Sequence, residues 1–498
     1  MNIENLYPEK VFHYFNEISK IPRGSKKEKM ISDWLFEFAK KRKLEVIQDN
    51  ALNILIKKKA TFGYEKYSPL IIQGHMDMVW EKNKETKFNF EKEGIKLFVE
   101  DGFLKADGTT LGADNGIAVA YALAILDSDN IKHPALEVII TSDEEDGMSG
   151  VNNLDYEIFK GKTLINLDTE EYGQVYVSSA GGARTSIQFI FESKKLETQK
   201  NSLVSIEVKG LSGGHSGAEI HLNLGNSNKI LSETLYHLSK KYNMSLSYID
   251  GGEKVNAIPR EAISYVAVDL NGDNFQEFKK LAELAFTNIL KDFKVSDKNP
   301  VLEVKELTEK DLEENKEVID YNDTLNLLTF LHKFPNGVLK MSENIEGLVE
   351  TSINLGVIKT IRESGTFQIK IQGLPRSSVN SSLKNLLNEI TDLTRNHEAN
   401  MKIDSSYPSW EYREDSKIRD LIVESFEKIT GKKAKIKAIH AGLECGIFAD
   451  NIENERKYYE LERRQKELEK EKFKKEETAP EFQPVKDNLT TYYIKKIT

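Results

Sequence analysis

This sequence has a single cysteine, no long apolar run and no excess of positive charge. Its single cysteine, Cys445, excludes an internal disulfide framework and fits a reducing cytoplasm. No apolar run approaches the roughly 20 residues of a membrane span, and the first residues, MNIENLYPEKVFHYF, do not resemble a secretion signal. A net charge of −10, with acids and bases interspersed, leaves no basic footprint for nucleic acid. We therefore expect a cytoplasmic protein without nucleic-acid or membrane partners.

The 498 residues exceed one ordinary core, so the length predicts two domains or a domain with a large insertion. Residues 1–183 and 400–452 have α/β character, and residues 184–399 form a separate α+β pattern. We expect the latter to be a lid domain inserted into the former. Residues 453–498 are an atypical tail, in which the charged stretch 453–477 predicts a solvated helix or a disordered tail.

Hydrophobic periodicity places the elements of the first domain. It predicts helices at 10–21, 26–43 and 117–126, and strands at 44–48, 53–57, 69–73, 136–141 and 162–168. After residue 400 it predicts a helix at 416–430 and a strand at 434–439. Strands alternating with helices indicate an α/β layer with parallel strands.

The middle of the chain contains a weak internal repeat. Strand 203–208 and strand 366–371 are each followed by a polar turn and a long helix, which extends to about residue 240 and 397 respectively. Another amphipathic helix is expected at 274–293. The charged stretch 303–323 predicts a surface excursion.

Residues of metal-ligand type occur in four segments of the first domain. Three of these segments directly follow apolar strands, and ligands of open α/β sheets gather beyond the carboxyl ends of strands. The residues are His75 with Asp77, Asp114, Glu144 with Glu145, and Asp168.

Each of these residues alone has a simple structural explanation, such as a core histidine, a helix cap or a solvated turn. Together, acids at several strand ends would repel one another unless cations lay between them. Oxygen and imidazole ligands suit Zn²⁺, with Mn²⁺ or Co²⁺ as substitutes. An aspartate bridging two ions would hold them roughly 3.5–4 Å apart, as in two-metal hydrolytic sites.

Six motifs then resemble those of a known family, and they occur in the family's order up to about Ile452. The family is that of the bacterial Xaa-His dipeptidases, also called aminoacyl-histidine or cytosol non-specific dipeptidases, within the two-zinc exopeptidase superfamily. The resemblance implies a zinc-exopeptidase-like mixed sheet flanked by helices, with an inserted α+β lid. The motifs are GHMDMVWEKN, GADNGIAVAYALAIL, TSDEEDGMSG, LINLDTEE, LSGGHSGAEIH and HAGLECGIF.

The resemblance also implies a role for each residue of the first domain. His75 would bind one metal and Asp77 would orient it, while Asp114 would bridge the two ions. Glu144 would be the general base that deprotonates the attacking water. The remaining two acids, Glu145 and Asp168, would each bind one metal.

In the lid domain, the resemblance implies that His215 stabilises the developing oxyanion, with help from Asn226. Arg376 would grip the terminal carboxylate of the substrate, although a surface arginine at a helix start is an equal alternative. His440 and Glu444 would face the substrate, with Glu444 available for a free amino terminus. A structural role for their loop competes with that interpretation.

One family feature is missing from this sequence. The family's His-Ser/Thr-Pro segment, which supplies the last metal ligand, has no counterpart, and no histidine follows His440. One metal would thus lose its imidazole.

The functional prediction is hydrolysis of Xaa-His and broader dipeptides with two divalent metal ions, when lid closure expels water and brings His215 to the metals. The alternatives are a catalytically impaired relative that binds peptide or metal, and a related aminoacylase or tripeptidase. A small peptide is the expected partner, and a homodimer is left open.

Overall fold

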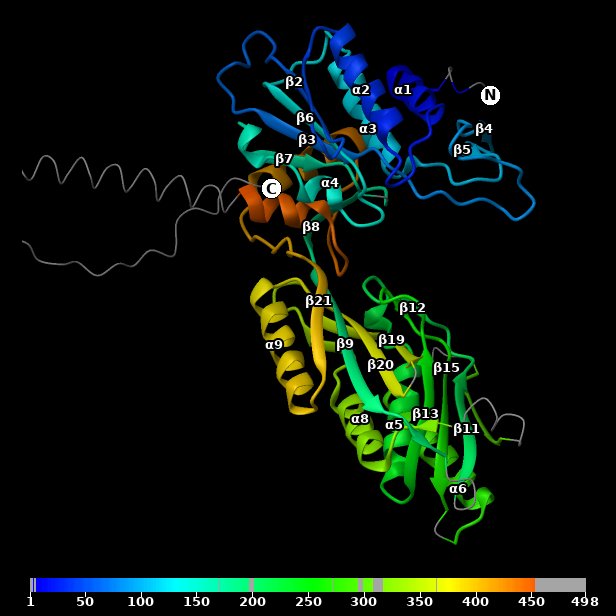
Figure 1. The fold of residues 1–498 in the computed structure, drawn as a ribbon. Helices are drawn as coiled ribbons and strands as arrows, with labels where there is room; N and C mark the ends of the chain where they lie inside the picture. The colour runs from blue at the N-terminus through cyan, green and yellow to red at the C-terminus, as the bar shows by residue number, and fades with distance from the viewer. Residues whose placement is uncertain are drawn as a thin grey trace, which may run out of the picture. The chain divides into compact units, whose positions relative to one another are not determined.

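A computed structural model describes residues 3, 6–169, 171–196, 201–270, 272–293, 299–307, 317–363 and 365–452. These residues divide into two compact units, which are coloured along the chain in Figure 1. The first unit contains the described residues up to Val177, Arg413–Lys437 and the described residues from Ile447. The second contains Ser178–Tyr412 and Ala438–Gly446. The predicted charged helix at 453–477 lies outside the described residues.

A five-stranded mixed sheet forms the centre of the first unit. Its strand order is β1-β2-β6-β3-β7, in which β3 runs parallel to β6 and β7 while β1, β2 and β6 pair antiparallel. All six residues of β6 are buried, as expected for an interior strand with apolar neighbours on both faces. The strands are β1 (Glu45–Gln48), β2 (Ile54–Lys58), β3 (Leu70–His75), β6 (Leu136–Thr141) and β7 (Thr163–Asn166).

Three helices pack on this sheet through one hydrophobic core. They are α1 (Glu9–Ser19), α2 (Lys29–Lys41) and α3 (Ala113–Leu126), and Figure 1 shows them beside β2, β3 and β6. The other elements with residues in this unit are α4 (Ser149–Asn152), α10 (Lys417–Thr430), the hairpin β4 (Leu97–Glu100) with β5 (Phe103–Ala106), and the ladder of β8 (Gln174–Ser179) with β22 (Lys435–Ile439). Because β3 pairs in parallel with both β6 and β7, these three strands end at the same edge of the sheet.

The second unit is built on a nine-stranded antiparallel sheet, with the order β16-β11-β15-β13-β19-β20-β9-β21 and β18 paired to β19. Its strands are β9 (Gly181–Glu192), β11 (Ser202–Lys209), β13 (Asn243–Gly251), β15 (Ala262–Asp269), β16 (Val301–Glu306), β18 (Gly337–Met341), β19 (Val349–Glu363), β20 (Thr366–Ser377) and β21 (Asn400–Tyr407). Two short ladders join β10 (Lys194–Lys195) to β17 (Glu317–Val318) and β12 (Gly214–His215) to β14 (Ala257–Ile258).

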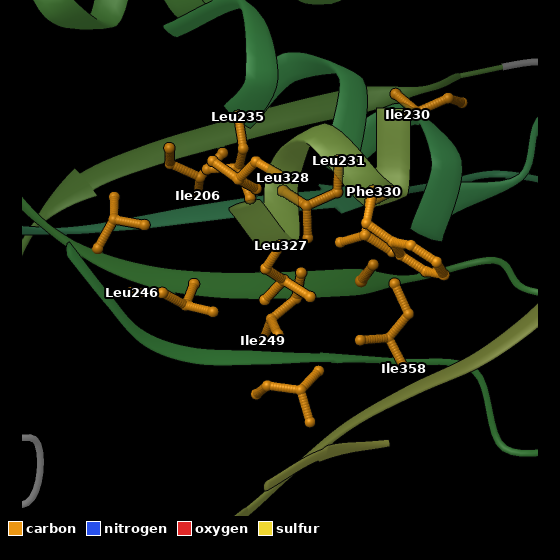
Figure 2. Close-up of a cluster of buried hydrophobic side chains, with 14 of the residues drawn as sticks. Ile206, Ile230, Leu231, Leu235, Leu246, Ile249, Leu327, Leu328, Phe330 and Ile358 are labelled. Carbon is orange, nitrogen blue, oxygen red and sulfur yellow. The ribbon is translucent and has the colours of Figure 1, made fainter. Parts of the chain in front are cut away.

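The hydrophobic core of the second unit lies between this sheet and its helices. The helices are α5 (Ser227–Ser239), α6 (Phe275–Ile289), α8 (Tyr321–Lys333) and α9 (Asn380–Asn396). Figure 2 shows part of this core, where Leu231 and Leu235 of α5 meet Leu327 and Leu328 of α8 above strand residues such as Ile249. Apolar residues at helical spacing in α5 and α8 supply the buried face.

The predicted mixed α/β fold is confirmed, and the predicted helices and strands occur within a few residues of the structural ones. The surface excursion predicted at 303–323 is wrong at both ends. Residues from 303 belong to β16, which pairs with β11, and α8 begins at Tyr321. The charged residues of β16 misled the sequence interpretation because β16 is an edge strand, where charged side chains can remain in water.

The second unit extends from Ser178 to Tyr412, beyond the expected bounds 184–399. It also includes Ala438–Gly446, which was expected in the first domain. Strand β21 pairs with β9 from Asn400 to Tyr407, so this segment extends the sheet of the second unit.

Among the described residues, none of the helices is both long and apolar enough to cross a membrane.

We expect Leu328→Ala to destabilise the second unit by about 2–5 kcal/mol, because its side chain is fully buried in the α5–α8 core. Denaturant unfolding followed by circular dichroism measures this change. Leu339→Ala is the matched control, since Leu339 is 44% exposed. Equal losses of stability for the two variants would contradict the packing described here.

Candidate active site

The parallel strands of the first unit bring the candidate metal ligands together. Strand β3 ends at His75, β6 ends two residues before Asp143, and β7 ends two residues before Asp168. The Nε2 atom of His75 lies 3.1 Å from Asp114 Oδ1 and 3.6 Å from Asp168 Oδ1. The ligand atoms of these three residues all lie within 4.8 Å of one another.

Glu144 lies at the edge of this group. Its Oε2 atom is 3.9 Å from His75 Nε2, farther than the carboxylates of Asp114 and Asp168. Glu145 is not part of the three-residue group, although its carboxyl group responds to the charge of Asp114. Among the residues that the structure describes, His75 is the one imidazole in such a group.

The electrostatics of the cluster favour added positive charge. Burial alone would lower the pKa of His75, but Asp114, Asp168 and Asp77 outweigh it and hold that pKa well above its ordinary value. Burial, together with the charge of Asp114, raises the pKa of Glu145 to about 7. A donor set of one imidazole and several carboxylates fits a divalent cation such as Zn²⁺ or Mn²⁺.

Asp77 holds the segment that carries the two glutamates. It is fully buried, and its Oδ1 atom lies 3.4 Å from His75 Nδ1, longer than an ordinary hydrogen bond. The same carboxylate accepts hydrogen bonds from the backbone N–H groups of Glu144 (3.0 Å) and Glu145 (3.3 Å). Asp77 therefore fixes the start of the acidic segment relative to His75.

Asp114 does not cap a helix, although it lies in the first turn of α3. The residue before that helix is Gly112, in a left-handed conformation, and no side chain caps the helix end. Hydrogen bonding to His75 lowers the pKa of Asp114. The cap interpretation of this residue is wrong, because its carboxylate lies beside the imidazole.

Asn115 is a site residue that the sequence analysis missed. Its Oδ1 atom accepts a hydrogen bond from His75 N (3.2 Å), and its Nδ2 atom donates to Asp168 Oδ1 (2.8 Å) and to Leu167 O (3.0 Å). A side chain at Gly74 would place its Cβ atom 2.4 Å from Asn115 Oδ1, so glycine is needed there. The available signal was its position next to Asp114 in GADNG.

In the second unit, hydrogen bonds from the backbone define the tautomer of His215. Its Nδ1 atom accepts hydrogen bonds from the N–H groups of Gly217 (3.2 Å) and Ala218 (2.9 Å). The proton of the neutral ring must then be on Nε2. Burial and the nearby charge of Arg376 lower the pKa of His215, which favours that neutral form.

Arg376 is buried at the end of β20, so the alternative of a surface arginine is wrong. Its Nη1 atom donates to the hydroxyl of Tyr407 (2.6 Å), a contact that the sequence gave no means of finding. His440 is also buried, and its Nε2 atom lies 2.7 Å from Ser352 Oγ. Burial, helped by the charge of Arg376, lowers the pKa of His440 to about 3, so His440 is neutral.

Asn226 and Glu444 have structural contacts or burial of their own. The side chain of Asn226 caps α5 by accepting from Lys229 N, and its Nδ2 atom donates to Asn354 Oδ1 (3.1 Å) and Leu355 O (3.2 Å). The structure therefore places Asn226 in a buried amide network. Glu444 is fully buried at the start of the helical segment that follows the loop after His440.

Comparison with known proteins assigns the chain to a class. The sequence model of peptidase family M20/M25/M40 matches residues 71–477, so the chain belongs to this family of peptidases.

Two individual relatives are similar over most of their length. The cytosol non-specific dipeptidase of Escherichia coli strain K12 is 34% identical over 447 residues, which cover 90% of both chains. The crystal structure of the aminoacylhistidine dipeptidase from Vibrio alginolyticus superposes with a TM-score of 0.80 at 33% identity, covering 90% of this chain and 89% of that one. These findings confirm the family resemblance seen in the motifs.

A more distant structure shares the fold alone. The aminopeptidase PepT of Bacillus cereus has a TM-score of 0.50 at 16% identity, with 89% of this chain and 87% of that chain covered.

We expect the full chain to bind Co²⁺ or Zn²⁺, and His75→Ala to weaken that binding by at least about 100-fold, because it removes an imidazole between three carboxylates. The visible absorption of bound Co²⁺ and elemental analysis after dialysis measure the loss. His13→Ala, an exposed histidine on α1, is the control. Unchanged binding in His75→Ala would place the metal elsewhere.

Proposed function

We propose that this chain is a metal-dependent dipeptidase that hydrolyses Xaa-His and broader dipeptides in the cytoplasm. The observation that carries the proposal is the convergence of His75, Asp114 and Asp168, with Glu144 beside them, at the ends of parallel strands. The names of the two similar relatives, a non-specific dipeptidase and an aminoacylhistidine dipeptidase, support the substrate class.

The proposed site holds two divalent ions, with Zn²⁺ favoured and Co²⁺ or Mn²⁺ as substitutes. In this proposal Asp114 would hold both ions, and its carboxylate is the one closest to His75 Nε2. His75, Glu145 and Asp168 complete the ligand set. When bound, such ions polarise a peptide carbonyl and lower the pKa of water toward roughly 7.

Glu144 is the proposed general base, and Asp77 orients His75 as an imidazole ligand requires. Two observations support the role of Glu144 as the base. The Glu144 carboxylate lies near the cluster but beyond its closest contacts, at 3.9 Å from His75 Nε2. Its backbone is held by Asp77, so the carboxylate starts from a fixed position. Glu144 would take the proton from water and later deliver it to the leaving amine.

His215 is the proposed donor to the developing oxyanion. Because two backbone N–H groups point at Nδ1, the Nε2–H group remains as the donor. A neutral donor suits this task, since it need not lose a proton when charge develops on the carbonyl oxygen.

Arg376 is the proposed partner of the substrate's carboxylate. Its Nη1 atom is anchored by Tyr407, which leaves the planar guanidinium in a defined orientation. His440 and Glu444 are further proposed substrate-binding groups. Asn226, whose side chain lies in a buried amide network next to α5, is proposed to assist His215. A homodimer is compatible with this function.

A second candidate is a metal-binding relative with impaired turnover. It is favoured by one sequence observation, the absence of any histidine after His440, which leaves the cluster with one imidazole. Metal content per chain, measured together with dipeptide hydrolysis, separates the two. Substrate panels of dipeptides, tripeptides and N-acyl amino acids distinguish the dipeptidase from a tripeptidase or an aminoacylase.

Glu144→Gln should retain the bound metal and lower kcat by about 10²–10⁴-fold, because it removes the proton acceptor without removing a ligand. Steady-state hydrolysis of a dipeptide and elemental analysis of the same sample test this. Asp146→Asn is the control, an exposed acid in the same segment that pairs with Lys26. Full turnover in Glu144→Gln would assign the base to another residue.

His215→Ala should lower kcat by about 10²–10³-fold while metal affinity stays constant, because an oxyanion donor acts on the substrate alone. The exposed His221, six residues further along, provides the control variant His221→Ala. Equal kinetics for both variants would exclude His215 from catalysis.

A further inference from the structure

Arg23 is a buried arginine that the proposed mechanism does not use. It lies in the Pro22-Arg23-Gly24 break between α1 and α2, and its exposed fraction is 1%. Arginine is almost never buried to this degree unless its donors are used. The contacts of its guanidinium group therefore identify what this residue holds in place.

The guanidinium joins two segments of the metal cluster through their backbone. Its Nη1 atom donates to Met76 O (3.0 Å), between the cluster residues His75 and Asp77. Its Nη2 atom donates to Gly112 O, two residues before Asp114. The backbone carbonyl of Arg23 accepts from Met78 N (3.0 Å). One side chain thus ties the segment after β3 to the start of α3.

Two glycines leave room for this group. A Cβ atom at Gly112 would lie 2.5 Å from Arg23 Nη2, and a Cβ atom at Gly116 would lie 2.6 Å from the same nitrogen. Gly112 also has a φ of +67°, a backbone angle that residues with a side chain rarely adopt. The start of α3 is therefore shaped around the guanidinium.

Two residues that follow Arg23 contact the segments after β3 and β6. The hydroxyl of Ser25 donates to Asp77 Oδ2 (2.8 Å), and Glu28 Oε1 accepts from Asp143 N (3.0 Å). The loop 23–28 thereby contacts the segments after β3 and β6 as well as the start of α3.

We infer that Arg23 is a positioning residue for the metal centre, which sets the distance between His75 and Asp114 by bridging the backbone next to each. The inference rests on the proposed metal-dependent function. A planar fork with two separated donors is needed to reach both carbonyl groups, so lysine, a single point charge on a flexible stem, does not replace it. The positive charge of Arg23 also interacts with the carboxylates of Asp77 and Asp114.

The test compares metal affinity in the full chain for Arg23→Lys, Arg23→Met and a control, Arg42→Met. Arg42 is a partly buried arginine of the same unit that binds Asp127 (2.6 Å) and Tyr14 (2.8 Å). Competition with a chromophoric chelator gives the Co²⁺ affinity, and denaturant unfolding of the metal-free proteins gives their stability.

We expect both Arg23 variants to bind Co²⁺ about 10–100-fold more weakly, with an altered Co²⁺ absorption spectrum, and Arg42→Met to keep the wild-type affinity. Arg23→Lys keeps the charge and decides the test if Arg23→Met does not fold. Wild-type affinity in Arg23→Lys, or an equal loss in Arg42→Met, overturns the inference. A wild-type chain that binds no metal overturns the proposed function as well, so the two failures are distinct.

Discussion

Repulsion between carboxylates at one edge of a parallel sheet is the constraint on which the first unit depends. Strands β3, β6 and β7 end side by side, and Asp77, Asp168 and the Glu144-Glu145 pair follow them while Asp114 joins from α3. Such a group is unfavourable without positive charge among its members. His75 supplies part of that charge, and its raised pKa reflects the acids around it. A divalent cation is the chemical species that this arrangement suits best.

The structure offsets the same repulsion with directed hydrogen bonds. Asp77 accepts from the backbone of both glutamates, and Asn115 connects His75 to Asp168. The side chain of Arg23 joins the backbone after β3 to the backbone before Asp114. Each contact fixes the position of a residue in this cluster. Precise geometry in metal sites generally depends on such outer contacts.

The second unit holds several polar side chains in place by local contacts. Its nine-stranded sheet and helix core form a rigid base for His215, Arg376 and His440. Backbone N–H groups set the tautomer of His215, and Tyr407 holds Arg376. Burial keeps His440 neutral, with a pKa near 3. The donors are thus oriented by local structure that no single motif contains.

The sequence alone predicted most of the helices and strands and three residues that the structure brings together. Hydrophobic patterns are local, so they predicted β3, β6, β7 and α3. The ends of parallel strands predicted that His75 and Asp168 would meet, and Asp114 was expected to join them from a helix start. Only the tertiary structure revealed the contacts of Arg23, Asn115 and Tyr407, which join residues 31 to 53 positions apart in the sequence. It also showed that Asp114 is not a cap and that β16 is an edge strand. The physical reason is that periodicity records which face of an element is buried, whereas hydrogen-bond partners distant in sequence are chosen by how those elements pack.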